Sequence, residues 1–126
     1  SREKIEKWKI DIIMPIPLHP RRLEKRGYNQ AGVLAEALGK KLGIPVDEKN
    51  LKRRKNTKPQ KELNHRERQK NMKNAFIVRK KLKEENILLV DDIYTTGSTI
   101  EEAAKELKKA GAQNIFFLTI AIGADS

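Results

Sequence analysis

Two adjacent carboxylates, Asp91 and Asp92, follow four aliphatic residues in the stretch ILLVDDIYTTGST, residues 87–99. Ionised carboxylates only accept hydrogen bonds, so such a pair suits the hydroxyls of a sugar or the water shell of Mg²⁺. A continuous apolar run is typical of a buried parallel strand, and ligands bind beyond the carboxyl ends of such strands. The pattern therefore predicts a ligand-binding acid pair at a strand end. Either acid could instead only brace the turn.

Small residues follow the acids and lead directly into a predicted helix: Thr95, Thr96, Gly97, Ser98 and Thr99. Free N–H groups at a helix start, together with the positive end of the helix dipole, attract anions. Glycine permits a close backbone approach, and the hydroxyls add donors. A well-capped helix without a ligand would look similar, so this segment is informative only behind the two acids. Together, acids and small residues predict a site for a ribose 5-phosphate.

The net charge of +11 is concentrated in one part of the chain. Residues 49–83 contain 15 lysines and arginines against two acids, a net charge of +13. A local positive field of this kind attracts phosphates, either of nucleic acid or of a small metabolite. A lysine-rich, solvated surface is the alternative interpretation.

The 126 residues contain no cysteine and no apolar run near 18 residues. Disulfides and cysteine-ligated zinc are thereby excluded for these residues, and no membrane span is expected. The first residues also lack the apolar stretch of a secretory signal. We therefore expect a cytoplasmic protein whose residues 1–126 form a single domain.

Strands and helices are predicted to alternate around the acid pair. We expect helices at 2–9 (within an N-terminal element 1–10), 29–42, 64–72 and 98–110, strands at 11–16, 45–51, 75–78, 87–91 and 114–122, and a mobile loop at 52–63. Asn29 is a predicted N-cap and Gly43 a predicted stop, while Asn64 and Glu67 resemble a capping box. We interpret Tyr28, Asn29 and Gln30 as helix-entry and packing residues. This alternation predicts an α/β domain with a mostly parallel sheet.

The stretch 87–99 resembles the phosphoribosyl-pyrophosphate (PRPP) signature of type I phosphoribosyltransferases, with Tyr94 where a smaller aliphatic residue is commoner. The wider chain is similar to the ComF family, which is linked to bacterial DNA uptake and competence. The segments that carry this similarity are PIPLHPRRLEKRGYNQA, LKRRKNTKPQKEL and ERQKNMKNAF. ComF-like proteins commonly begin with a cysteine-rich segment, which this chain lacks.

The resemblance implies a Rossmann-like, mostly parallel sheet flanked by helices, and a glycosyltransferase of nucleotide metabolism. Its ligands would be PRPP or a nucleoside monophosphate, with Mg²⁺ held through PRPP rather than directly by the protein. Relatives with this fold are often homodimers. No element that would recognise a nucleobase is evident, so the acceptor is not assigned.

The resemblance also implies a role for particular residues. Asp91 and Asp92 would hold the ribose hydroxyls, and residues 95–99 would cradle the 5-phosphate. A pyrophosphate loop would contain Leu18, His19, Arg21 and Arg22, and a flexible loop that closes over the site would contain Arg53, Arg54 and Lys55. Arginine and lysine are suitable donors to such a concentrated anion.

Other functions remain open at this point. The basic segment 49–83 could make the chain a nucleic-acid-binding module, or the fold could sense PRPP or nucleotides without catalysis. A protein of the competence machinery is a further candidate partner. A phosphoacceptor receiver domain also begins with a strand and an acid pair, but Asp125 is the only later aspartate, so we reject it.

Overall fold

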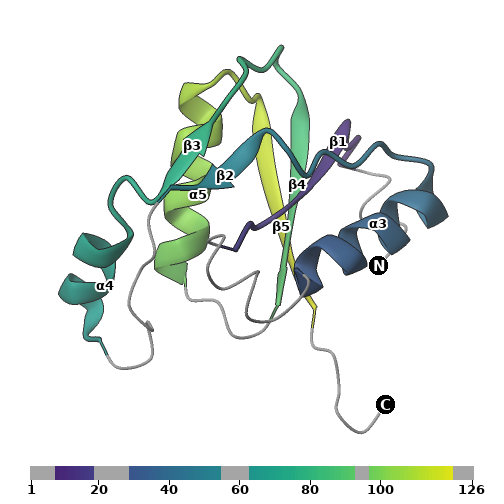
Figure 1. The fold of residues 1–126 in the computed structure, drawn as a ribbon. Coiled ribbons are helices and arrows are strands. Elements are labelled where there is room, and N and C mark those ends of the chain that lie inside the picture. The colour runs from purple at the N-terminus through teal and green to yellow at the C-terminus, as the bar shows by residue number, and fades with distance from the viewer. Residues whose placement is uncertain (1–7, 19–28, 55–62, 93–96, 121–126) are drawn as a thin grey trace, which may run out of the picture.

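The computed structural model describes residues 8–18, 29–54, 63–92 and 97–120 (Figure 1). Its main sheet is parallel, has the order β1–β4–β5, and consists of β1 (Ile12–Pro15), β4 (Asn86–Asp92) and β5 (Asn114–Ile120). A second, antiparallel pair consists of β2 (Leu51–Arg53) and β3 (Phe76–Val78). The described helices are α3 (Gln30–Leu42), α4 (His65–Met72) and α5 (Gly97–Lys109). A parallel sheet flanked by helices confirms the predicted fold class.

The central strand β4 is buried on both faces. Ile87 and Leu89 belong to the hydrophobic cluster that contains Leu107 of α5, whereas Leu88 and Val90 belong to the cluster that contains Ala35 of α3. Successive side chains of a strand point to opposite faces, so α5 covers one face of the sheet and α3 the other. Burial on both sides explains why the aliphatic run is continuous rather than alternating.

Helix α3 begins and ends where its capping residues predict. The Asn29 side chain accepts a hydrogen bond from the Ala31 N–H, and Gly43 adopts the left-handed conformation with φ 69°. Near its end the helix backbone lies so close to Val46 that a Cβ on Gly39 would be only 2.4 Å from a Val46 methyl group. Only glycine, which has no Cβ, allows this approach. Since Val46 pairs with Ile13 of β1, this contact holds the end of α3 against the sheet.

The predicted strand at 45–51 is wrong for most of its length. Only Val46 pairs with the sheet, through a single parallel bridge to Ile13. The chain then turns, because the Asp47 carboxylate accepts from the N–H groups of Lys49 and Asn50 at 2.9 and 3.0 Å. Aspartate commonly stabilises turns in this way, which ends the extended segment early.

The mobile loop predicted at 52–63 also begins too early. Lys52 and Arg53 pair with Ile77 and Phe76 in the antiparallel ladder, so they belong to β2. Residues 55–62 lie outside the described residues. The sequence did not predict that Lys52 and Arg53 belong to a strand, because the strand with which they pair, β3, lies more than twenty residues further along the chain.

The part of the N-terminal helix predicted at 2–9 that the structure describes is not helical. Residues 1–7 lie outside the described residues, and Trp8 and Lys9 form a turn rather than a helix end, with Lys9 at φ 52°.

The capping box of α4 is confirmed, since Asn64 and Glu67 each accept from the backbone N–H of the other. That residues 1–126 form one domain stays a prediction.

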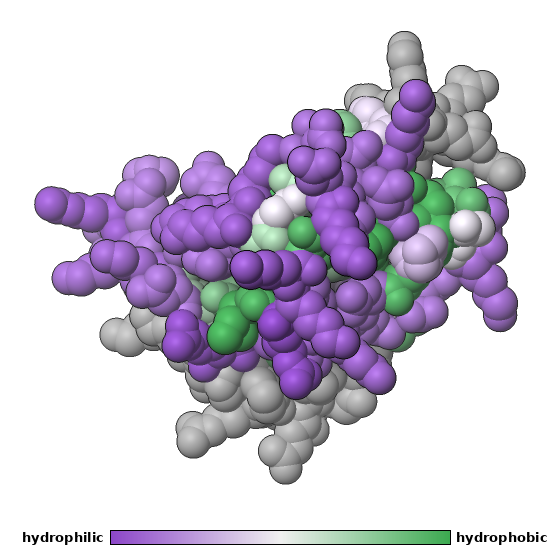
Figure 2. All heavy atoms as spheres, turned by 90° about the horizontal axis from the view of Figure 1, so that it is seen from above, coloured by the Kyte–Doolittle hydropathy of each residue, from purple (hydrophilic) through white to green (hydrophobic). Residues whose placement is uncertain are grey.

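Polar side chains dominate the face of the molecule that Figure 2 shows, where hydrophilic residues surround small hydrophobic areas. Among the residues described, we find no helix with the length and apolar character needed to cross a membrane.

Candidate functional site

Asp91 and Asp92 occupy the last two positions of β4. The ladder aligns Val90 with Pro15 of β1, and it aligns Asp92 with Ile120 of β5. Both acids therefore lie at the edge where the three parallel strands end. Asp91 continues the series that faces α5 and is only 5% exposed. A hydrogen bond between a ligand and a carboxyl group so well shielded from water is stronger than the same bond in water.

Helix α5 begins at the same edge of the sheet. Only four residues separate Asp92 from Gly97, so the helix start cannot lie far from the strand end. Among the described residues, no heavy atom lies within 4 Å of the position that a Cβ on Gly97 would take, and Thr99 is buried at 3% exposure. The described residues thus leave the backbone at Gly97 open to a ligand. Thr95 and Thr96 lie outside the described residues.

The chain that leaves β1 runs beside the acids. The Ile16 N–H donates to the carbonyl of Val90 at 2.9 Å, one residue before Asp91. Pro17 and then Leu18, the first residue of the predicted pyrophosphate segment, therefore follow directly beside the end of β4. His19, Arg21 and Arg22 of that segment lie outside the described residues.

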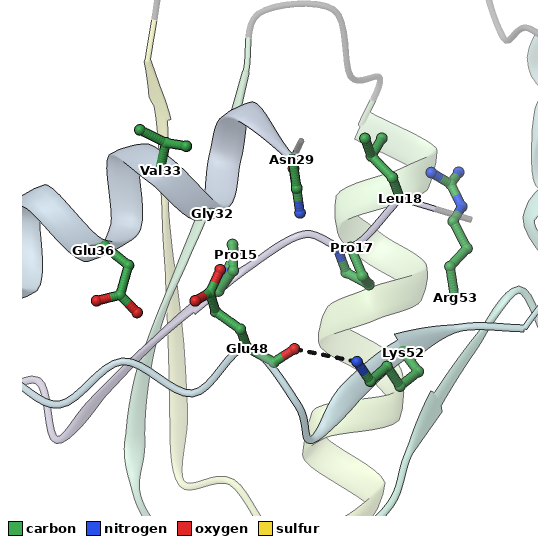
Figure 3. Close-up of a pocket in the computed structure, with 10 residues that line it drawn as sticks. All are labelled: Pro15, Pro17, Leu18, Asn29, Gly32, Val33, Glu36, Glu48, Lys52 and Arg53. Carbon is green, nitrogen blue, oxygen red and sulfur yellow. Dashed lines mark hydrogen bonds between the residues drawn. The ribbon is translucent and has the colours of Figure 1, made fainter. Parts of the chain in front are cut away.

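A cavity of about 530 Å³ opens beside the end of β1 and the start of α3 (Figure 3). It is lined by the end of β1 with Leu18, by the first turns of α3, and by Glu48, Lys52 and Arg53. The cavity thus brings together Leu18 of the predicted pyrophosphate segment and Arg53 of the predicted flexible loop.

Arg53 is more firmly held than a residue of a flexible loop would be. Its guanidinium carbon lies 5.2 Å from the centre of the Phe76 ring, and an Nη atom donates to the Met72 sulfur at 3.7 Å. The neighbouring Arg54 is exposed, with its backbone N–H donating to Ala75. Lys55 lies outside the described residues. The structure therefore places Arg53 at the base of the predicted loop rather than within it.

Two carboxyl groups that the sequence analysis missed also line the cavity, Glu36 of α3 and Glu48 (Figure 3). A Cβ on Gly32 would lie 2.5 Å from a Glu48 carboxyl oxygen, so the glycine leaves room for that group against the helix. Partial burial raises the pKa of the Glu48 carboxyl above its ordinary value of 4.5. A hydrogen bond with Glu36 and the charge of Glu36 raise it further, while the charge of Lys52 lowers it. No sequence spacing links the two glutamates, because they lie on different elements.

This carboxyl pair gives a pH prediction. A raised pKa in the folded state means that folded protein keeps the proton to higher pH than the unfolded chain. The stability that Glu48 contributes is therefore present below pH 4.5 and is lost as the pH rises through the folded-state pKa. Glu48→Gln should remove this loss, so that the variant gains stability relative to wild type as the pH rises above 4.5.

The effect should be smaller than about 1 kcal/mol, the range of exposed charge pairs. Urea unfolding at several pH values measures it, and Glu36→Gln is the matched partner because it removes the same repulsion. A difference between Glu48→Gln and wild type that is constant with pH would contradict the prediction.

A second cavity, of about 560 Å³, lies between α4 and α5. Four basic side chains line it together with two acids and smaller polar groups; the basic residues are Arg66, Lys70, Lys73 and Lys105. Ser98 also lines this groove, so it adjoins the start of α5. We call this surface the α4–α5 groove.

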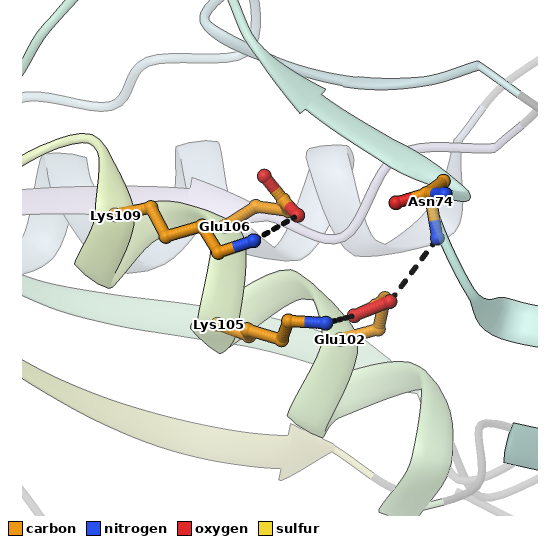
Figure 4. A network of polar contacts seen from close by, with 5 residues as sticks. All are labelled: Asn74, Glu102, Lys105, Glu106 and Lys109. Carbon is orange, nitrogen blue, oxygen red and sulfur yellow. Dashed lines mark hydrogen bonds and ion pairs between the residues drawn. The ribbon is translucent and has the colours of Figure 1, made fainter.

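Glu102 joins the two sides of the α4–α5 groove (Figure 4). Its carboxylate accepts from the Asn74 N–H at 3.1 Å and pairs with Lys105 at 3.5 Å. Asn74 lies in the turn after α4 and has φ 59°, and Glu102 is only 8% exposed. The shielded carboxylate therefore fixes the turn after α4 to α5.

Within the described stretches, no three His, Asp or Glu side chains come together as metal ligands would. Mg²⁺ is usually bound by one or two carboxylates plus substrate phosphates rather than by a cage of protein ligands. The residues at the end of β4 fit that second mode.

Comparisons with known proteins agree with this architecture. The family model described as the phosphoribosyl transferase domain matches residues 2–125. Competence protein F of Haemophilus influenzae is 40% identical over 108 residues, which are 83% of this chain and 47% of that protein. Competence protein ComFC of Streptococcus pneumoniae is 37% identical over 113 residues, 90% of this chain and 49% of that protein.

DNA utilization protein YhgH of Escherichia coli is 37% identical over 102 residues, 81% of this chain and 45% of that protein. The chain thus spans about half the length of the curated relatives it matches. Among solved structures, a purine phosphoribosyltransferase from Pyrococcus horikoshii has a TM-score of 0.58 at 22% identity. That match covers 94% of this chain and 65% of the other, and it supports the fold.

Proposed function

Since this chain is a ComF-like member of the type I phosphoribosyltransferase family, we propose that it binds PRPP with Mg²⁺ and transfers the ribose 5-phosphate to an acceptor. The observation that carries this proposal is the edge where β4 ends in Asp91 and Asp92 beside the start of α5. Acceptors for a diol and donors for a phosphate meet there, as a ribose 5-phosphate requires.

In the proposed reaction, pyrophosphate leaves the anomeric carbon of PRPP and the acceptor forms the new bond to that carbon. Asp91 and Asp92 accept hydrogen bonds from the ribose hydroxyls and so orient the ring. The N–H groups at the start of α5 and the Ser98 hydroxyl donate to the 5-phosphate. Positive charge that develops on the ribose is favoured next to the two carboxylates.

The proposed Mg²⁺ would be held by the pyrophosphate of PRPP and by water, and Asp91 and Asp92 would accept hydrogen bonds from that water. When bound, it neutralises charge on the leaving pyrophosphate. Basic residues of the segments that begin at Leu18 and follow Arg53 add further donors in this proposal.

Calorimetry with PRPP and Mg²⁺ tests the proposal. We expect saturable binding that is lost with EDTA. No heat from folded protein would contradict PRPP binding. Release of pyrophosphate on addition of candidate bases or amines then tests transfer, and PRPP binding without release under any acceptor would favour a PRPP-sensing role instead.

The α4–α5 groove favours a second function, nucleic-acid binding by the basic segment 49–83. Arg66 and Lys70 lie one turn apart on α4, Lys73 is the residue that ends the helix, and all three are exposed and line the groove. Such a row suits a chain of phosphates. Relatives named for competence and DNA utilization are consistent with this candidate.

A gel-shift titration with single-stranded DNA tests the second function. Binding should weaken steeply with salt and should be reduced by Lys70→Gln combined with Lys73→Gln. Lys40→Gln with Lys41→Gln, at the end of α3, is the matched control for lost charge. Equal effects of the two double variants would show that the groove has no special role.

A further inference from the structure

Asn29 makes two side-chain hydrogen bonds, and only one of them belongs to helix capping. Its Oδ1 accepts from the Ala31 N–H at 3.1 Å, as an N-cap does. Its Nδ2 donates to the carbonyl of Ile16 at 3.1 Å, across 13 residues of sequence. A single amide therefore joins the start of α3 to the chain that leaves β1.

The carbonyl that Asn29 holds belongs to the residue that also joins β1 to β4. The Ile16 N–H donates to the Val90 carbonyl at 2.9 Å, and Asp91 follows Val90. Ile16 is thus held on one side by the strand that carries the acids and on the other by Asn29. Its successors, Pro17 and Leu18, leave the sheet from this fixed point.

The close-up of the cavity shows the same arrangement (Figure 3). The Asn29 side chain extends from the start of α3 toward the chain between Pro15 and Pro17. Pro17 is buried and Leu18 is half-buried at the cavity wall. Because proline has no N–H, Pro17 cannot donate a backbone hydrogen bond that would fix its place. The bond from Asn29 to the preceding carbonyl therefore matters more for where Leu18 lies.

We propose that Asn29 is a positioning residue, which sets the place of Pro17 and Leu18 relative to Asp91 and thereby supports the pyrophosphate end of the PRPP site. The inference rests on the proposed function. It assigns Asn29 a role that an N-cap alone does not have, because serine, threonine or aspartate could cap the helix equally well. Only asparagine combines that cap with an amide donor at the required reach.

The experiment distinguishes the Nδ2 donor of Asn29 from the Oδ1 acceptor that caps α3. Asn29→Ser keeps a neutral N-cap oxygen and lacks Nδ2, while Asn29→Ala lacks both groups. Asn64→Ser makes the same change at the N-cap of α4, which lies in a capping box with Glu67. Wild type and variants are titrated with PRPP and with ribose 5-phosphate, each with Mg²⁺, after their melting temperatures have been compared.

Asn29→Ser should bind PRPP about tenfold more weakly, the size expected for one hydrogen bond that holds a binding group in place. Its affinity for ribose 5-phosphate, which has no pyrophosphate, should change less than about twofold. Asn64→Ser should leave both affinities unchanged. Asn29→Ala should repeat the result of Asn29→Ser for PRPP at a lower melting temperature.

The outcomes are distinguishable. If wild type does not bind PRPP, the proposed function itself fails. If wild type binds and Asn29→Ser binds PRPP equally well, the positioning role is wrong. Equal weakening of PRPP and ribose 5-phosphate would show that Asn29 only supports the fold, which also overturns the inference.

Discussion

An Asp91→Asn, Asp92→Asn double variant should bind PRPP at least about 100-fold more weakly than wild type. Hydrogen bonds to charged groups contribute about 1.5–3 kcal/mol each, and the variant replaces two charged acceptors by neutral amides. The substitutions conserve size, so the buried position of Asp91 is not left with a cavity. Calorimetry with PRPP and Mg²⁺ measures the change, and a melting curve shows whether the variant is folded.

Asp11→Asn is the matched control for this double variant. Asp11 precedes β1 at the opposite, amino end of the same sheet, where its carboxylate accepts from the Asn86 N–H at 2.8 Å. An asparagine oxygen can accept that bond, so both the fold and PRPP affinity should be retained. A folded double variant that binds PRPP as wild type does would show that the ribose does not bind at the end of β4.

Phe76→Ala should lower the free energy of unfolding by about 3–5 kcal/mol. The ring is 2% exposed and lies in the cluster that contains Leu51, Met72 and Leu107. It also lies beneath the Arg53 guanidinium, whose carbon is 5.2 Å from the ring centre. Because domains are typically stable by only about 5–15 kcal/mol, this single change removes a large part of the total.

Ile77→Ala provides the comparison for Phe76→Ala. Ile77 is the next residue of β3, points to the opposite face, and is 41% exposed. Its truncation should cost about 1 kcal/mol or less, and urea unfolding measures both variants. Similar losses at the two positions would contradict the prediction that burial of the Phe76 ring makes it the more important of the two side chains for stability.

The elements that sequence predicted well are those with strong local signals. The caps at Asn29 and Asn64 act over two or three residues, so their helices begin where expected. The aliphatic run of β4 is long enough to identify a buried strand. In contrast, the predicted strand at 45–51 failed because Asp47 turns the chain, and β2 was missed because its partner β3 is distant in sequence.

The candidate site likewise has parts that the sequence predicted and parts that it did not. Its carboxylates and its helix start lie within thirteen consecutive residues, so almost any fold that makes a strand followed by a helix brings them together. For that reason the sequence alone predicted a ribose 5-phosphate site at this place. The positive charge of the basic segment 49–83 could also be predicted, because it follows from the residue types and does not depend on which strands pair.

The tertiary structure alone decided which distant side chains meet. It paired the Asn29 amide with Ile16, the Glu48 carboxyl with Glu36, and the Arg53 guanidinium with Phe76. Each of these contacts joins two elements whose distance depends on how helices and strands pack. Sequence records local preference, whereas such contacts exist only once the chain has buried its apolar faces.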